Sequence, residues 1–432
     1  MVSGVSVPLV GLVDAGVAGR LEAPEALGGV ALGGWLFEML CWTFGFLRMG
    51  TTGLVAQAEG SGDQQAQVVT LARALITALV IGLTLSLGAI WLTGPSLELL
   101  AGGQGPSASS GASYLTARMW GATPAMLNYV CLGWLLGRAR PRSALALQLV
   151  MNSLNMGLSL WWGPRYGVAG IGAASAAAQW LTACLGLAWV LLKTTPKLPR
   201  GALLKGLRDH AAWSSLAKLN LDLMVRTSLL LAVFGAMNSV SARLGALTLS
   251  ANALLLHLQS LQAFALDGFA HGVEVLSGEA YGAGAGTRLK GAVRVGLRLT
   301  MGTAALISLC YAVGSDELFA LLTRHEEVSL IARELAPWAI ISPLISAPCF
   351  LLDGVMVGAT QGSAMRRGMS WSALVFILSA CLAVPSLGNH GLWLSLMCFM
   401  LARALTLRPQ LKELYARSEG AEAPLTPRDD PC

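Results

Sequence analysis

The sequence has little charge for its length, and this scarcity excludes most kinds of soluble protein. Only 12% of its 432 residues are Asp, Glu, Lys or Arg, whereas 55% are hydrophobic and the mean hydropathy is +0.63. A soluble domain typically carries about 25% charged residues, because its surface must be hydrated. A chain this poor in charge must present much of its surface to lipid.

Several other signals are missing as well. The eight cysteines include no Cys-x-x-Cys pair, so neither a disulfide framework nor a zinc site is indicated. The net charge is +6, but the basic residues gather in a few connections, so we expect no nucleic-acid partner. We find no nucleophile–base pair and no HExxH motif, and the GAGAG at 282–286 does not follow a strand. We therefore expect neither an enzyme nor a bound cofactor or metal.

What the chain does contain is a series of apolar runs, many of them close to the 20 residues that cross a bilayer as a helix. Because an open sheet cannot satisfy its backbone in lipid, we predict an all-α membrane protein with about twelve transmembrane helices. The runs are Val5–Ala18, Leu27–Ala56, Leu71–Leu92, Met119–Leu136, Ala144–Trp162, Val168–Leu192, Leu216–Met237, Ala246–Leu266, Val295–Val313, Ala336–Ala359, Trp371–Pro385 and Leu392–Leu405.

Basic residues alternate between the connections that join these runs. They follow the fourth, sixth, eighth, tenth and twelfth runs, whereas the connection after the ninth run is acidic. The positive-inside rule then places the even-numbered connections and the C-terminus in the cytoplasm. The long basic connection at 193–210 divides the chain into two six-helix lobes, 1–192 and 211–409, and the polar tail at 410–432 is expected to be disordered.

The two halves carry a weak internal repeat. Phe44–Gly60 aligns with Leu266–Gly282, and the alignment pairs Gly50 with Gly272, Leu54 with Leu276, Ala58 with Ala280 and Gly60 with Gly282. Two repeated helical bundles around a central site are a common plan among transporters. The repeat therefore favours two pseudo-symmetric lobes.

One acidic residue, Asp14, lies inside the first apolar run. An aspartate at the centre of a membrane helix costs roughly 2.5–3.5 kcal/mol on insertion scales, so such a group is a candidate for function. We predict that Asp14 takes part in coupling the protein to an ion gradient.

An ordered set of motifs resembles a known family. The runs PLVGLVD (8–14), FGFLRMGTTGL (44–54), GWLLGRARPR (133–142), GVAGIGAA (167–174), ALDGFAHGVEVLSGEAYG (265–282), LLDGVMVGAT (351–360) and GNHGLWL (388–394) are similar to the DinF-type branch of the multidrug and toxin extrusion (MATE) family. The resemblance implies two six-helix lobes and export of small organic, often cationic, compounds in exchange for protons or Na⁺. It also implies a multi-pass protein of a bacterial inner membrane, and we expect a monomer.

The resemblance also implies roles for particular residues. Asp14 matches the first-helix aspartate used for ion coupling, and Asn155 matches the asparagine of an Asn-x-x-x-Asp motif whose second acid is Ser159 here. With one acid in place of two, protons are favoured over Na⁺, because a single carboxylate can bind and release a proton as its surroundings change. Met1 lies only seven residues before Pro8, a shorter lead than the family carries, so a truncated first helix is one expectation.

Further charged residues fall within the predicted helices. Asp222 and Arg226, which follow Asn220, lie one turn apart and form either an intrahelical ion pair or part of a substrate cavity. Asp267, His271 and Glu274 share one helix face and either line a cavity or reach interfacial water. Arg118 is interpreted as a residue near a helix end that reaches the interface by snorkelling, and no role is predicted for Glu38.

The leading hypothesis is therefore a proton-coupled exporter that works by alternating access between two lobes. A flippase-like exporter of amphipathic or lipid-linked metabolites is the alternative, and a larger, more cationic cavity would favour it. The candidate cavity residues are mixed in sign, which suits small cations at least as well.

Overall fold

The computed structural model of the chain describes residues 11, 13–21, 25–101, 103, 105–194, 199–323 and 325–422. Within these ranges every regular element is a helix and none is a strand. Seven helical segments of the described chain are long and apolar enough to cross a membrane. The predicted all-α membrane fold is thereby confirmed. Residues 1–10 and 12, on which the expected truncation of the first helix depends, lie outside the described residues.

The described residues divide into two compact units, one within 1–55 and 63–220 and the other within 56–62 and 221–432. The boundary falls inside helix α9 (His210–Leu244), which continues through it and contains neither Gly nor Pro between residues 210 and 234. The connection that we predicted as a linker contains a short helix, α8 (Arg200–Leu207), which packs on α4 (Gln64–Ala101). Arg73 of α4 donates a hydrogen bond to the carbonyl of Gly206.

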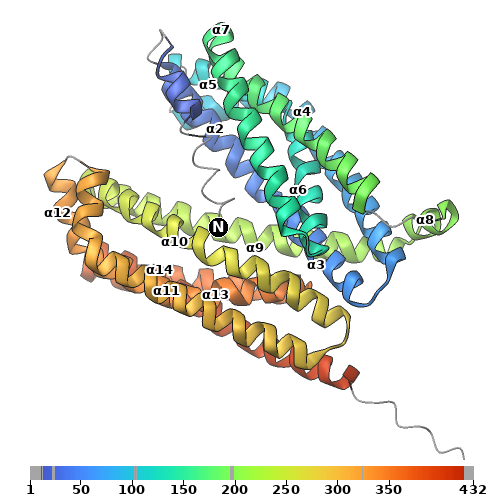
Figure 1. Cartoon of the computed structure of the whole chain (residues 1–432). Coiled ribbons are helices and arrows are strands. Elements are labelled where there is room, and N and C mark those ends of the chain that lie inside the picture. The colour runs from blue at the N-terminus through green and yellow to red at the C-terminus, as the bar shows by residue number, and fades with distance from the viewer. Residues whose placement is uncertain are drawn as a thin grey trace, which may run out of the picture. The chain divides into compact units, whose positions relative to one another are not determined.

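The first unit is built from α2 (Glu25–Thr43), most of α3 (Phe46–Gly60), α4, α5 (Pro106–Met119), α6 (Ala122–Gly137), α7 (Pro141–Trp189) and a turn of π-helix at Val190–Thr194. Helix α5 packs on both α2 and α7, and α6 packs on α4 and α7 (Figure 1). The run that we predicted at Met119–Leu136 corresponds to α6 alone. Helix α5 was missed because its Ser-rich sequence is too polar to stand out as an apolar run.

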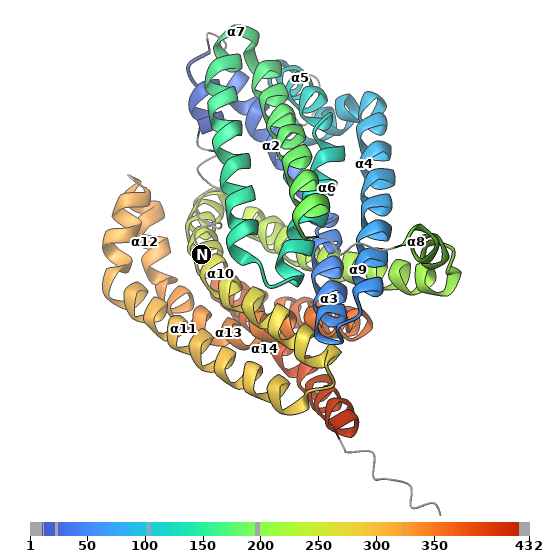
Figure 2. The same ribbon diagram turned by 45° about the vertical axis from the view of Figure 1, so that its right-hand side comes forward.

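The second unit contains the rest of α9 together with α10 (Ala246–Gly282), α11 (Gly286–Leu322), α12 (Glu326–Glu334), α13 (Ala336–Gly358) and α14 (Gly362–Glu422). Helices α10, α11 and α13 pack against one another, and α14 packs on α13 (Figure 2). Because α14 continues to Glu422, the expectation of disorder is wrong for 410–422. Leu414 and Ser418 are buried there, which explains the ordered end. Residues 423–432 lie outside the described residues.

The turns of the two units recur at equivalent places. Left-handed backbone with positive φ occurs in three pairs of turns, and the second member of each pair lies 221 or 222 residues after the first: Gly62 and Gly284, Ala139 and Thr360, Gly167 and Gly388. Gly167 and Gly388 are the sharp bends inside α7 and α14, and each bend separates two of the predicted membrane runs. This spacing matches the offset of the repeat found in the sequence.

The repeated glycines of that alignment also have a structural reason. Within the second unit, a Cβ on Gly60 would lie 2.0 Å from the carbonyl oxygen of Glu279, and one on Gly282 would lie 2.1 Å from the carbonyl oxygen of Gln57. Each glycine thus lets the backbone of the other helix approach directly, as small residues do where membrane helices cross. A side chain at either position would force the end of α3 away from the end of α10.

Candidate functional site

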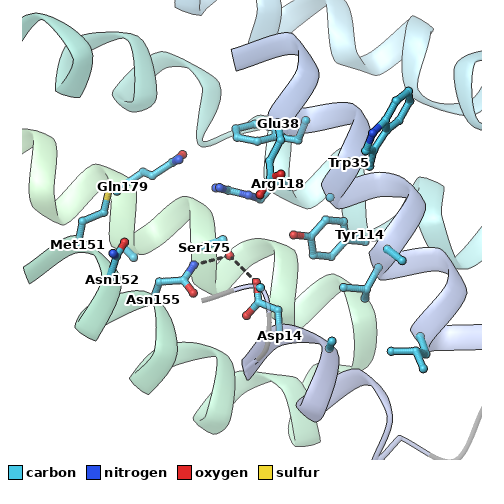
Figure 3. A pocket seen from close by; sticks show the side chains of 18 residues that line it. Asp14, Trp35, Glu38, Tyr114, Arg118, Met151, Asn152, Asn155, Ser175 and Gln179 are labelled. Carbon is cyan, nitrogen blue, oxygen red and sulfur yellow. Dashed lines mark hydrogen bonds between the residues drawn. The ribbon is translucent and has the colours of Figure 1, made fainter. Parts of the chain in front are cut away.

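A cavity of about 380 Å³ lies inside the first unit. It is enclosed by the first helical segment, which comprises residues 11 and 13–18, and by α2, the C-terminal half of α5 and both halves of α7 (Figure 3). Its polar and aromatic lining residues are Asp14, Trp35, Phe37, Glu38, Tyr114, Arg118, Asn152, Asn155, Ser175 and Gln179. The cavity therefore combines ionisable groups, amides and aromatic rings.

Local packing holds Asp14 at this cavity. Val17 and Ala18, on the next turn, are buried against Val30, Tyr114 and Ile171. The bend at Gly167 folds the two halves of α7 back on each other, which brings Asn155 and Ser175 together although they are 20 residues apart. The first helical segment and both halves of α7 thus meet around one carboxylate.

The hydrogen bonds around Asp14 leave it partly unsatisfied. Its side chain is only 6% exposed, and its Oδ2 accepts one long hydrogen bond, 3.5 Å, from the hydroxyl of Ser175. Asn155 Nδ2 donates to the same hydroxyl at 2.5 Å, whereas Asp14 Oδ1 and Asn155 Oδ1 have no hydrogen-bond partner. Buried oxygens without a partner cost about 1–3 kcal/mol each, more when charged, so this site is suited to receive a proton or a cation.

The residues that the sequence predicts for ion coupling lie together here. Asp14 and Asn155 line the same cavity, and the dashed lines in Figure 3 connect both to Ser175. Ser159, one helical turn after Asn155, is completely buried and lies beside the Asp14 carboxylate. The immediate surroundings of Asp14 therefore contain neutral hydroxyl and amide groups, with no second carboxylate at position 159.

Two further charged residues of this cavity were not recognised from the sequence. Arg118 lies in the last turn of α5, as expected, but its guanidinium stacks on the ring of Phe37, 4.0 Å from the centroid, and lines the cavity. The snorkelling interpretation is wrong, because α2 packs on α5 and encloses this side chain. Glu38 lines the same cavity, and Arg118 interacts electrostatically with both Glu38 and Asp14.

The predicted candidates on α9 are placed differently. Asn220 belongs to the first unit, whereas Asp222 and Arg226 belong to the second. Asp222 pairs with Arg366 at 3.0 Å, and Arg226 forms an ion pair with Asp353 of α13. The intrahelical pair suggested by the spacing of Asp222 and Arg226 is therefore wrong, because each residue has a closer partner on another helix.

Asp353 is the centre of a buried ion cluster. Besides Arg226, it binds Arg403 of α14 at 2.5 Å, and Arg403 is only 3% exposed and lies beside the rings of Phe350 and Phe399. Asp267 of α10 interacts electrostatically with Arg403. Helices α9, α13 and α14 are thus joined by opposite charges inside the second unit.

Glu274 and His271 lie further along α10. Glu274 is 2% exposed, and His271 is half-buried. Neither lines the cavity of the first unit. Their predicted roles, like those of Asn220, Asp222, Arg226 and Asp267, stay predictions.

Comparisons with known proteins agree with this architecture. The MatE family model matches residues 1–161 and 223–384. The chain is 38% identical over 414 residues to DNA damage-inducible protein F of Escherichia coli, with 94% of this chain and 88% of that protein covered. It is 25% identical to the "Probable multidrug resistance protein NorM" of Rhizobium meliloti, with 86% and 82% covered.

A solved structure shows the same fold. The crystal structure of MATE in the bent conformation superimposes with a TM-score of 0.85 at 17% identity, covering 98% of this chain and 94% of the other. The membrane-spanning helices and the bacterial relatives indicate a multi-pass inner-membrane protein that transports small molecules and is not an enzyme. With a family model that covers most of its length and a relative at 38% identity over nearly all of it, this chain is a member of the MATE (MatE) family of secondary transporters.

Proposed function

We propose that this transporter exports small organic compounds, often cationic, in exchange for protons, and that Asp14 carries the proton. The observation that carries the proposal is the Asp14 carboxylate, buried at a cavity with one oxygen that has no hydrogen-bond partner. An isolated buried carboxylate is costly, and protonation removes its charge. Alternate opening of the cavity to water on each side would then let Asp14 release and bind a proton in turn.

The surroundings of Asp14 support protons over Na⁺. A bound Na⁺ would need several oxygen ligands and negative charge to balance its own. At the positions around Asp14, the groups from Asn155, Ser159 and Ser175 are all neutral. A proton needs only the carboxylate oxygen itself.

The cavity lining supports cationic cargo. It carries two carboxylates, Asp14 and Glu38, against one guanidinium, Arg118, and it presents the rings of Trp35 and Phe37. Aromatic faces and carboxylates both attract organic cations. The name of the NorM relative, a probable multidrug resistance protein, supports drug-like compounds as the cargo. A flippase for lipid-linked cargo is less well supported, because it calls for a more cationic cavity.

Orientation and assembly complete the proposal. Basic residues between α6 and α7 and near both ends of α14 support a cytoplasmic C-terminus under the positive-inside rule. A monomer is the proposed transporting unit.

The experiment that tests the proposal uses purified protein in proteoliposomes with either a proton gradient or a Na⁺ gradient. We expect proton-driven ethidium transport to fall at least tenfold in Asp14→Asn and the Na⁺ gradient alone to drive none. Asp63→Asn is the matched control, because Asp63 is an exposed acid that caps α4 of the same unit, and it should transport as the wild type does. Full transport by Asp14→Asn, or transport driven by Na⁺ alone, would contradict the proposal.

A further inference from the structure

Arg118 stands out because a cavity suited to organic cations already contains a cation. Its guanidinium is flat and delocalised, and it lies on the buried ring of Phe37 at 4.0 Å from the centroid. Figure 3 shows this side chain between Glu38 and Asp14, with Tyr114 beside it. This is the position that the ring and the carboxylates make attractive for any planar cation.

The contacts of Arg118 are those of a counter-ion more than those of a packing residue. It attracts both carboxylates of the cavity electrostatically, and its Nη1 is buried without a hydrogen-bond partner. A buried N–H group without a partner costs free energy that another arrangement can recover. The guanidinium is therefore held by charge, by the ring and by a hydrogen bond with Tyr114, with one nitrogen left unsatisfied.

We propose that Arg118 is an internal counter-cation that occupies the organic-cation position on the face of Phe37, so that a substrate binds by displacing the guanidinium. This inference rests on the proposed function, because it assumes that the cavity is the substrate site. In this arrangement Arg118 offsets one of the two carboxylate charges of the cavity when no substrate is present. It also makes Arg118 a determinant of specificity, since only a cation that interacts with the ring and the carboxylates better than the guanidinium can replace it.

The test is equilibrium binding of ethidium, a planar cation whose charge does not depend on pH, to the purified full-length protein without any gradient. We expect Arg118→Met to bind ethidium about tenfold more tightly, because the competing charge is gone and the carboxylates remain. Arg118→Lys, which keeps the charge, should stay within about threefold of the wild type. Arg165→Met is the matched control, because Arg165 also stacks on an aromatic ring, Trp161, in the same unit but outside the cavity, and it should change nothing.

A second variant and a second probe make the outcome decisive. Adding Phe37→Leu to Arg118→Met should weaken ethidium binding again by about threefold to tenfold, since the cation–π contribution is lost. Unchanged or weaker ethidium binding by a folded Arg118→Met protein would overturn the proposal. So would loss of binding of the anionic dye fluorescein in Arg118→Met with ethidium binding unchanged, because Arg118 would then be a ligand for anions.

These readouts are separate from the test of proton coupling. If Asp14→Asn still transports with a proton gradient, the proposed coupling fails, but tighter ethidium binding by Arg118→Met would still support competition at the cavity. If binding does not change in Arg118→Met while Asp14→Asn loses transport, only the role of Arg118 fails.

Discussion

In the first unit, Asp14, Glu38 and Arg118 line a cavity, whereas the second unit has neutral residues at the positions 221 and 222 residues later: Gly235 and Ala236, Gln259 and Ser260, Ala339 and Ile340. Gln259 does not line the cavity of the first unit but belongs to a buried hydrogen-bonded group, in which its Oε1 accepts from Gln262 and from Ser342. At these positions the first unit thus carries ionisable groups, whereas the second unit carries neutral residues. The two units share the positions of their turns but differ in the ionisable side chains at the positions of the cavity residues.

The second unit has charges of its own, but it uses them differently. Asp353 is held between Arg226 and Arg403, so its carboxylate has two cationic partners inside the protein. Asp14 accepts one long hydrogen bond from a neutral hydroxyl and is attracted electrostatically by one cation, Arg118. A paired charge stabilises the arrangement that pairs it, whereas an unsatisfied charge remains available for a ligand or a proton. The comparison therefore assigns a structural role to one cluster and an exchange role to the other.

The largest expected effect comes from breaking the ion cluster of the second unit. Asp353→Asn would remove the carboxylate that pairs with both Arg226 and Arg403, and removal of one partner from a buried pair typically costs about 3–5 kcal/mol. We expect a clear loss of thermal stability in detergent, measured by unfolding of the purified protein.

The comparison supplies a rescue and a control for this variant. The double variant Asp353→Asn with Arg226→Met should recover part of the loss, because it restores the charge balance around Arg403. Glu38→Gln, which removes an acid from the cavity of the first unit, should leave the unfolding temperature almost unchanged. Equal stability losses in Asp353→Asn and Glu38→Gln would erase the difference between the two units.

An intermediate loss of stability is expected when a buried carboxylate, like those of the first unit, is introduced into the second unit. Gln259→Glu places a carboxylate 221 residues after Glu38, at a position in the second unit where the side chain is 5% exposed. The two donors from Gln262 and Ser342 offset only part of the cost of burying it, so we expect a loss of about 1–3 kcal/mol at neutral pH. Thermal unfolding is again the measurement. An unchanged stability would show that this site accepts charge as easily as the first unit does.

The smallest effect concerns the turns at Ala139 and Thr360. Both residues have positive φ, 51° and 53°, which is unfavourable for a residue other than glycine. Ala139→Gly should stabilise the protein by about 0.5–1 kcal/mol, because the strain is relieved and the exposed side chain is small. Thr360→Gly should gain less, since the Thr360 hydroxyl accepts a hydrogen bond from Gln57 at 3.0 Å. A larger gain at Thr360 than at Ala139 would contradict this assignment.

Long apolar runs predicted most of the helices, whereas the short or polar helices could not be recognised from hydropathy. The runs at Leu71–Leu92 and Ala336–Ala359 lie in α4 and α13, and the offset of the repeat is matched by the paired turns. Helices α5, α8 and α12 were missed, because α5 is polar and the other two span only a turn or two. Their order depends on packing against other helices, which no local pattern encodes.

The residues of the candidate site could be predicted where their type and spacing are unusual for a membrane helix. Asp14 stands alone in an apolar run, and Asn155 and Ser159 share a helix face by their spacing, so these positions could be singled out in the sequence. Arg118 near a helix end looks like any residue at a membrane interface. Only the packing of α2 on α5 shows that it faces a cavity with Glu38. In the sequence, the hint of a charged cavity was that Glu38 and Arg118 each lie alone in a stretch of low charge.

Helix α9 has a mechanical consequence for the protein as a whole. The boundary between the units falls within its hydrogen-bonded turns, and the 25 residues from 210 to 234 contain no glycine or proline that would let the helix fold over. This crossing between the units therefore consists of continuous helix and not of a flexible linker. At this crossing, a movement of one unit relative to the other would have to bend or twist α9 itself.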